Sequence, residues 1–218
     1  MKGTLAIAGR EFRSYFYSPL AYVVICVGLF LLGIFFFLFR GGFWQIDRAS
    51  FDRMFQYGAL GLSLFIIPVI TMRLLAEEKR SGTLEMLITL PVKDTEVILG
   101  KYLGALGLVL VMLLGTALYP IFMFGWPWNL GPLDPGPVLA GYLGLILFSA
   151  AAIAIGLMVS AFTESQTVAF FITFVALLIL HNLSTIGEFA PGAIGEFLRV
   201  LSFDTNLQKF ARGLIDTR

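Results

Sequence analysis

The charged side chains that could take part in chemistry gather in one segment, residues 73–91, between two long apolar runs. The segment contains Glu77, Glu78 and Arg80, and the Ser-Gly pair at 81–82 is expected to end the helix that carries them. Acids and bases in this arrangement can pair with one another or with a charged partner. They do not make a catalytic set, because no nucleophile lies beside a base.

A second, short helix is expected directly after that Ser-Gly pair. It begins near Thr83 and is about two turns long, with Leu84, Leu87 and Ile88 on one face and Glu85 beside them. A short helix with an apolar face and charged flanks suits docking into a groove on a soluble partner. It suits lying on lipid headgroups equally well, and the spacing alone does not decide between the two.

The rest of the sequence carries no pattern typical of an enzyme. Gly100-Lys101 is followed by Tyr102 and lacks the glycine spacing of a phosphate-binding loop, so we expect no ATP hydrolysis by this chain. One histidine and one cysteine cannot supply a zinc site, and His181 is expected to be an interfacial imidazole. A net charge of +1 gives no indication of nucleic-acid binding.

The composition indicates that the elements holding these residues are membrane-spanning helices. Of the 218 residues 58% are hydrophobic and 13% charged, against about 25% charged in an ordinary soluble domain. Five uncharged stretches of 19 to 32 residues are each long enough for a span, which needs roughly 20. The predicted spans are residues 20–39, 54–76 with a kink at Pro68, 97–124 capped by Asp94 or Thr95, a fourth ending near 162, and 167–183.

Residues 1–18 predict an amphipathic helix in the membrane interface, because Ser18-Pro19 should break it from the first span. The alternative is a simple extension of that span. Lys and Arg number eight on the side of the amino terminus and the 73–101 segment, against three in the first opposite loop and four in the tail. Because cytoplasmic loops carry the excess, we expect a multi-pass protein of the plasma or inner membrane with a cytoplasmic amino terminus.

The tail, residues 184–218, is then extracytoplasmic and shows apolar residues at helical spacing. Two short surface-lying or re-entrant helices fit this pattern, and a short soluble cap is the alternative. The predicted fold is therefore an all-α integral membrane protein, a single transmembrane domain over residues 1–218. It consists of an interfacial amphipathic helix, five transmembrane helices and a short helical extracytoplasmic tail.

The charged segment, the start of the third span, two stretches of the fourth span and the link after it resemble the ABC-2 type transporter permeases, especially those of the gliding-motility and copper-processing type. The residues that carry the resemblance are Glu77-Glu78-Lys79-Arg80-Ser81-Gly82-Thr83-Leu84-Glu85, Leu90-Pro91-Val92, Leu99-Gly100-Lys101, Gly141-Tyr142-Leu143-Gly144-Leu145, Ile153-Ala154-Ile155-Gly156-Leu157 and Thr163-Glu164-Ser165-Gln166.

The resemblance implies a permease subunit of an ATP-binding-cassette exporter, paired with a second copy or a second permease in the lipid membrane. A separate cytoplasmic ATPase subunit would hold the ATP and Mg, and this chain no cofactor. Residues 77–96 would be the cytoplasmic coupling loop, and the short helix from Thr83 the coupling helix docked on the ATPase. Glu77, Glu78 and Arg80 would flank that contact, and the link with Glu164 and Gln166 would make a second, smaller one.

Family members usually have six spans with both ends cytoplasmic, so the tail is expected to lead to a missing sixth span. A truncated copy and a natural five-span variant both fit that expectation. A different class of function also stays open: a membrane anchor or assembly scaffold for a cytosolic ATPase, which would share the docking helix but move no substrate. The sequence does not indicate the cargo.

Overall fold

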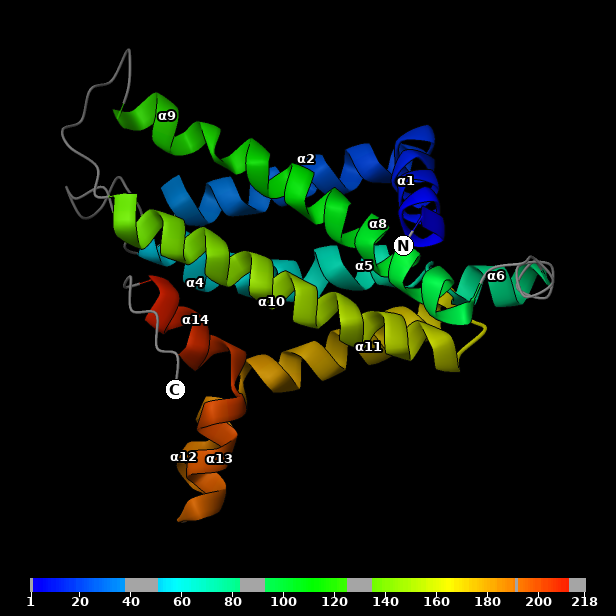
Figure 1. Cartoon of the computed structure of the whole chain (residues 1–218). Coiled ribbons are helices and arrows are strands. Elements are labelled where there is room, and N and C mark those ends of the chain that lie inside the picture. Colours follow the sequence, from blue (N-terminus) through cyan, green and yellow to red (C-terminus); the bar gives the residue numbers. More distant parts are fainter. Residues whose placement is uncertain (1, 38–50, 83–92, 125–134, 191, 212–218) are drawn as a thin grey trace.

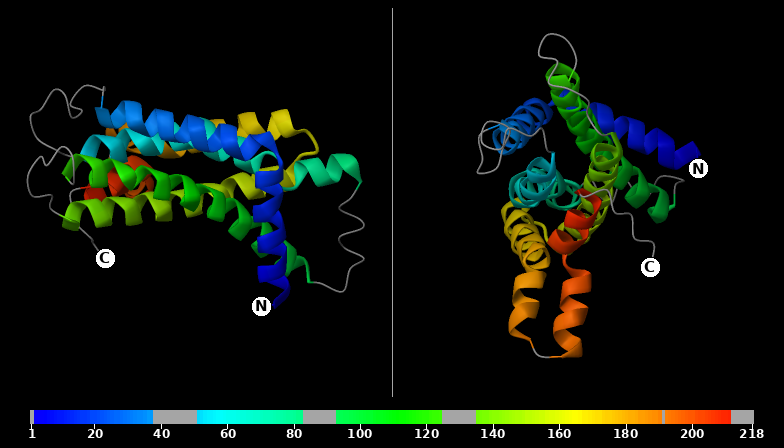
Figure 2. Two further views of the ribbon diagram at one scale, coloured as in Figure 1. Left: turned by 90° about the horizontal axis from the view of Figure 1, so that it is seen from above. Right: turned by 90° about the vertical axis from the view of Figure 1, so that its left-hand side faces the viewer.

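The computed structural model describes residues 2–37, 51–82, 93–124, 135–190 and 192–211, and every regular element in these ranges is a helix (Figure 1). The long helices run side by side, while α1 at one end and the pair α12 and α13 nearer the other lie across them (Figure 2). The predicted all-α class is confirmed for the described residues.

The first helix, α1 (Lys2–Tyr17), is separate from the first long helix, α2 (Pro19–Phe37). The break falls at Ser18, as Ser18-Pro19 predicts, and the Ser18 hydroxyl accepts a hydrogen bond from the Leu20 backbone N–H at 3.3 Å. A serine cap followed by proline in the first helical position is a favourable helix start. It lets α1 turn across the bundle and pack along α8.

The second span lies at the centre of the bundle and is not a uniform α-helix. It comprises α4 (Asp52–Gly61), a π-helical segment (Leu62–Ile66), α5 (Ile67–Thr71) and α6 (Ala76–Ser81). The Ile67 N–H bonds to the carbonyl of Leu62, five residues back. The irregularity expected at Pro68 is thus a widened turn directly before it, since a π segment accommodates the carbonyls that the proline ring displaces.

Two further long helices complete the core. They are α8 (Asp94–Thr116), continued by α9 (Leu118–Phe124), and α10 (Pro135–Phe162). The expected cap of α8 by Asp94 or Thr95 is wrong: Lys93 occupies the cap position and makes no side-chain cap bond. Asp94 lies in the first turn, where its charge still suits the positive end of the helix dipole.

The fifth predicted span, residues 167–183, has nearly the expected bounds but does not qualify as a span alone. Helix α11 (Gln166–His181) has 16 residues, and it meets the length and hydropathy requirement for a span only together with α12 (Leu183–Phe189), from which it bends by 55°. Four helices of the described chain qualify alone, and a fifth span exists if the bent pair is counted. Helices α13 (Ala193–Leu201) and α14 (Phe203–Ala211) follow, and α14 packs back against α10 and α4 rather than lying apart on a surface.

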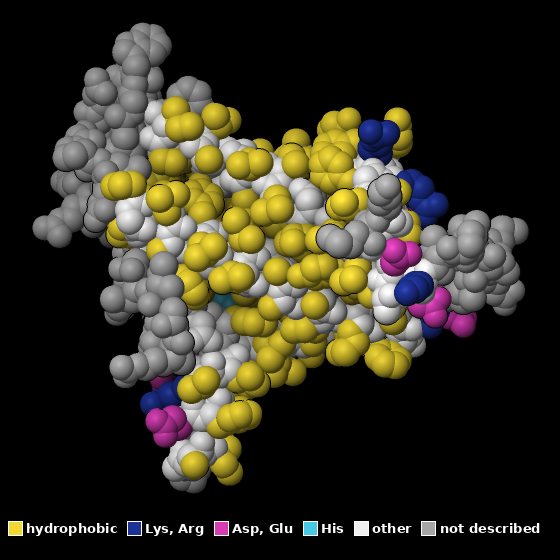
Figure 3. Space-filling model, in the orientation of Figure 1, with side chains coloured by type: hydrophobic (Ala, Val, Ile, Leu, Met, Phe, Trp, Pro, Cys, Tyr) yellow, Lys and Arg dark blue, Asp and Glu magenta, His cyan; other side chains and the backbone are white. Residues whose placement is uncertain are grey.

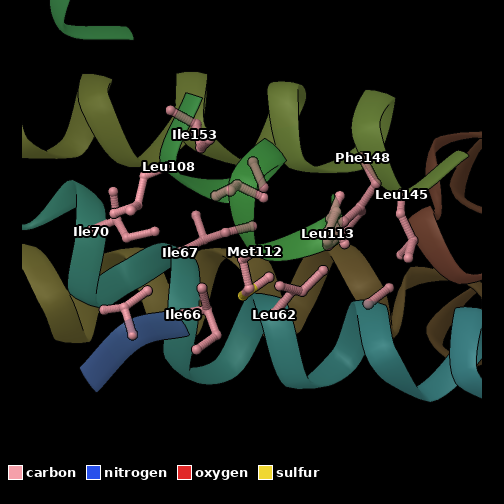
Figure 4. Packing of buried hydrophobic residues seen from close by; sticks show 14 of the residues in the cluster. Leu62, Ile66, Ile67, Ile70, Leu108, Met112, Leu113, Leu145, Phe148 and Ile153 are labelled. Carbon is pink, nitrogen blue, oxygen red and sulfur yellow. The ribbon is translucent and has the colours of Figure 1, made fainter. Parts of the chain in front are cut away.

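The core is formed where the second span meets α8 and α10. Figure 4 shows Leu62, Ile66, Ile67 and Ile70 facing Leu108, Met112 and Leu113 of α8 and Leu145, Phe148 and Ile153 of α10. The outer sides of the long helices expose Phe, Leu, Ile and Val, while charged side chains gather near the ends (Figure 3). This distribution is that of a bundle whose flanks contact lipid rather than water.

Candidate functional site

The predicted site residues that the structure describes lie at one end of the bundle. Glu77, Glu78 and Arg80 belong to α6, while Glu164 and Gln166 lie at the link from α10 to α11. Figure 1 shows α6 and that link at the same end of the bundle as α1. The remaining predicted residues, Thr83, Leu84, Glu85, Leu87 and Ile88, lie outside the described residues, so the coupling helix stays a prediction.

A buried lysine of α8 is at the centre of this end. The Lys101 ammonium lies 2.6 Å from Oε1 of Glu78 on α6 and 3.3 Å from Oε1 of Glu11 on α1, and its side chain is only 3% exposed. A buried charge is tolerated when it is paired and hydrogen-bonded. One lysine therefore joins three elements that are far apart in the sequence.

A second ion pair lies beside the first, on the turn that leads into α6. Arg73 donates to both carboxylate oxygens of Glu77, at 2.7 and 3.1 Å. Such a bidentate pair fixes the orientation of both side chains. Together with Arg10, Tyr15 and Lys101, these residues line a polar cavity of about 420 Å³ between α1, α6 and α8. Burial first, and then the Glu11 carboxylate, raise the pKa of the Tyr15 phenol well above its usual range.

Helix α6 is also attached to α10. The Ser160 hydroxyl of α10 accepts hydrogen bonds from the backbone N–H groups of Leu75 and Ala76, at 3.1 and 3.0 Å, so it satisfies donors that begin α6. The Lys79 ammonium donates to the carbonyl of Ala161. At its other end α6 stops at Gly82, whose φ of 70° places it in the left-handed region, as the Ser-Gly break predicts.

Glycines allow α1 to approach α8 closely. A Cβ on Gly100 would lie 2.6 Å from Cγ2 of Ile7, and one on Gly104 would lie 2.8 Å from Cβ of Glu11. Both distances are shorter than any real carbon contact, so larger residues would push α1 away. This approach brings Glu11 within reach of Lys101.

The link between α10 and α11 is a short polar loop. Its Glu164 is exposed, and the Thr163 hydroxyl accepts a hydrogen bond from the Ser165 N–H at 3.2 Å before α11 begins at Gln166. No ion pair joins Glu164 to α6 among the described residues. The structure thus brings the two predicted contact regions to one end without joining them through these side chains.

Sequence reasoning missed Lys101, Glu11 and Ser160 as parts of this site. A signal existed for Lys101, because it is a charged residue inside the predicted apolar span 97–124. No signal existed for Ser160, since an isolated serine in an apolar helix has many roles. Lys101 lies in the second turn of α8, so the deeper parts of the spans remain without charges in the described residues.

A bundle of apolar helices whose charged groups lie at its ends defines a multi-pass membrane protein. The sequence model of the ABC-2 family transporter proteins matches residues 45–203, which are 159 of the 218 residues. The chain belongs to this family and is a transmembrane component of an ABC transport system. Comparisons with curated proteins and with solved structures give no significant match. The gliding-motility and copper-processing type stays a prediction.

Proposed function

We propose that this chain is the permease subunit of an ATP-binding-cassette exporter, driven by a separate cytoplasmic ATPase that docks at the α6 end of the bundle. The observation that carries the proposal is the Lys101 contact with Glu78 and Glu11. It ties α6, from which the chain runs directly into the predicted coupling helix, to α8 and α1. A displacement of the docking segment would therefore reach the transmembrane helices through buried contacts.

The charge pattern supports a cytoplasmic location of this end. The Lys/Arg excess of the sequence lies on this side, and Arg80 of α6 is exposed there. On this proposal the amino terminus is cytoplasmic and α1 lies in the inner interface of the plasma or inner membrane. ATP and Mg bind the partner, and closure of the ATPase pair switches a dimer of permeases between two states.

The experiment is affinity purification of the tagged full-length chain from its own membranes in mild detergent. We expect mass spectrometry to find an ATPase with a phosphate-binding loop at a comparable amount. The double variant Leu84→Asp with Leu87→Asp is expected to insert normally but to lose that ATPase, because it puts charge into the apolar docking face. The matched control is Val200→Asp with Leu201→Asp, which changes two exposed apolar residues of α13 at a distance from α6.

Retention of the ATPase by the Leu84 and Leu87 double variant would contradict the docking assignment. Loss from both double variants would show a general defect rather than a broken contact. A membrane anchor without transport would also bind the ATPase, so substrate-dependent stimulation of ATP hydrolysis in the purified complex separates the two functions. Only a permease should show it.

A further inference from the structure

A polar cavity lies away from the Lys101 cluster, toward the opposite end of the bundle. It has a volume of about 210 Å³ and lies between α4, the α11–α12 bend and the start of α14. Its polar lining consists of Gln56, Tyr57, His181, Asn182 and Asp204, with two hydroxyl residues of α12. Polar and ionisable side chains are rare inside membrane-spanning bundles, and where they occur they often have a function.

His181 supplies the first observation that indicates a ligand. Its side chain lines the cavity, the residue is 8% exposed, and Nδ1 has no hydrogen-bond partner among the described residues. The backbone around it is satisfied, since the His181 carbonyl accepts from the Ser202 hydroxyl at 3.2 Å. Buried ring nitrogens are normally hydrogen-bonded, so this imidazole is expected to interact with a bound group or water.

Asp204 supplies the second observation, which concerns charge. It is the one formally charged side chain that lines the cavity in the described part of the chain, and no ion pair of this carboxylate occurs there. Oδ2 accepts from Nε2 of Gln208 at 2.9 Å, so one carboxylate oxygen is held in place. Its position in the first turn of α14 favours the negative charge.

The neighbouring amide adds a further acceptor. Nδ2 of Asn182 donates to the carbonyl of Leu178 at 2.9 Å, which leaves Oδ1 of Asn182 to accept from a ligand. A carboxylate, an amide oxygen and an imidazole with an unpartnered ring nitrogen thus line one small space. This set matches a group that is positively charged and carries several N–H donors.

We propose that this cavity binds a primary ammonium group, with Asp204 supplying the charge and His181 and Asn182 accepting N–H hydrogen bonds. The volume is below the roughly 300–1,000 Å³ of pockets that enclose a drug-sized ligand. It therefore fits a headgroup-sized amine, either a small soluble amine or the amino headgroup of a lipid. Binding here needs no ATPase, so the proposal does not rest on the proposed function.

The test uses the purified full-length chain in nanodiscs of phosphatidylcholine and phosphatidylglycerol, in phosphate buffer, with ethylammonium as the probe. Saturation-transfer NMR measures binding at the ethylammonium methyl group. We expect saturable binding, and at least a tenfold weaker Kd for Asp204→Asn. Glu196→Gln is the matched control, because it removes an exposed acid of the neighbouring helix α13 that does not line the cavity. Tetramethylammonium, which has the charge but no N–H group, should bind at least tenfold more weakly than ethylammonium.

A second variant and a second membrane composition complete the test. His181→Phe keeps the carboxylate and removes the ring nitrogens, so it should also weaken binding, and it carries the test if Asp204→Asn does not fold. Addition of phosphatidylethanolamine to the nanodiscs distinguishes the sources. Competition with ethylammonium identifies the lipid headgroup as ligand, and unchanged binding identifies a soluble amine. Equal binding by wild type and the folded cavity variants, an equal loss in Glu196→Gln, or no binding of either amine would overturn the proposal.

Discussion

Replacement of Lys101 by methionine tests whether the buried charge cluster holds the α6 end together. Methionine keeps most of the side-chain length and removes the ammonium. At an effective dielectric constant of about 20, two contacts at these distances correspond to roughly 5–6 kcal/mol of attraction each. Desolvation of the three ions, at several kcal/mol each, offsets most of that attraction.

The net cost arises because two acids lose the ammonium that they share, although Glu11 keeps a 3.3 Å contact with the exposed Arg10. The side chains of Glu11 and Glu78 are 16% and 18% exposed, so water compensates them poorly. Removing one partner of a buried ion pair costs about 3–5 kcal/mol. For a chain of this size that corresponds to a fall in Tm of roughly 6–20 °C, at about 2–4 °C per kcal/mol.

The assay is thermal unfolding in one detergent, followed by circular dichroism at a fixed protein concentration. Lys93→Met is the matched control, since Lys93 is an exposed lysine at the start of the same helix, and its Tm should change little. The triple variant Lys101→Met, Glu11→Gln, Glu78→Gln removes all three charges of the cluster and should regain most of the lost Tm. A triple variant as unstable as Lys101→Met would refute the electrostatic reasoning and assign the effect to packing.

Two other predictions concern α1. Gly100→Ala forces a Cβ against Ile7 and should lower the free energy of unfolding by about 1–3 kcal/mol. The control is Gly9→Ala, whose Cβ would meet nothing within 4 Å and which should stabilise the chain by roughly 0.5–1 kcal/mol. A fall in Tm for both variants would contradict the close approach of α1 to α8. Because the pKa of Tyr15 is raised in the folded chain, its phenol ionises at a lower pH in the unfolded chain than in the folded one. The free energy of unfolding should therefore fall as the pH rises above about 10. In Tyr15→Phe the loss of Tm between pH 9 and 11 should be smaller, and an unchanged pH profile would show that the phenol is not buried.

The spans were predictable because their cause is local. A bilayer requires a minimum apolar length, and the uncharged stretches of the sequence provide it. The Ser18-Pro19 break and the end of α6 at Gly82 were predictable for the same reason, since proline and glycine act on their own backbone. The π segment was not, because Pro68 shows only that the helix must adjust and not on which side.

The candidate site was predictable only in part, because its contacts are not local. Glu11 lies 90 positions before Lys101 in the sequence, and Glu78 lies 23 before it. No periodicity relates them, and only the packing of α1 on α8 places them together. The charged segment itself could be identified from its composition. The short amphipathic helix predicted within it falls outside the described residues, so both that helix and its role stay predictions.

The attachments of α6 bear on how the proposed coupling would work. Moving α6 away from the bundle would separate Lys101 from Glu78 and uncap the two N–H groups that Ser160 satisfies. Both changes take hydrogen-bond or ion-pair partners away from buried polar groups, which is costly. A change at the π segment, residues 62–66, breaks none of these contacts, and such segments often occur where helices adjust. A force on the docking segment would therefore move α6, α8 and α1 together. The second span would adjust at its π segment, residues 62–66.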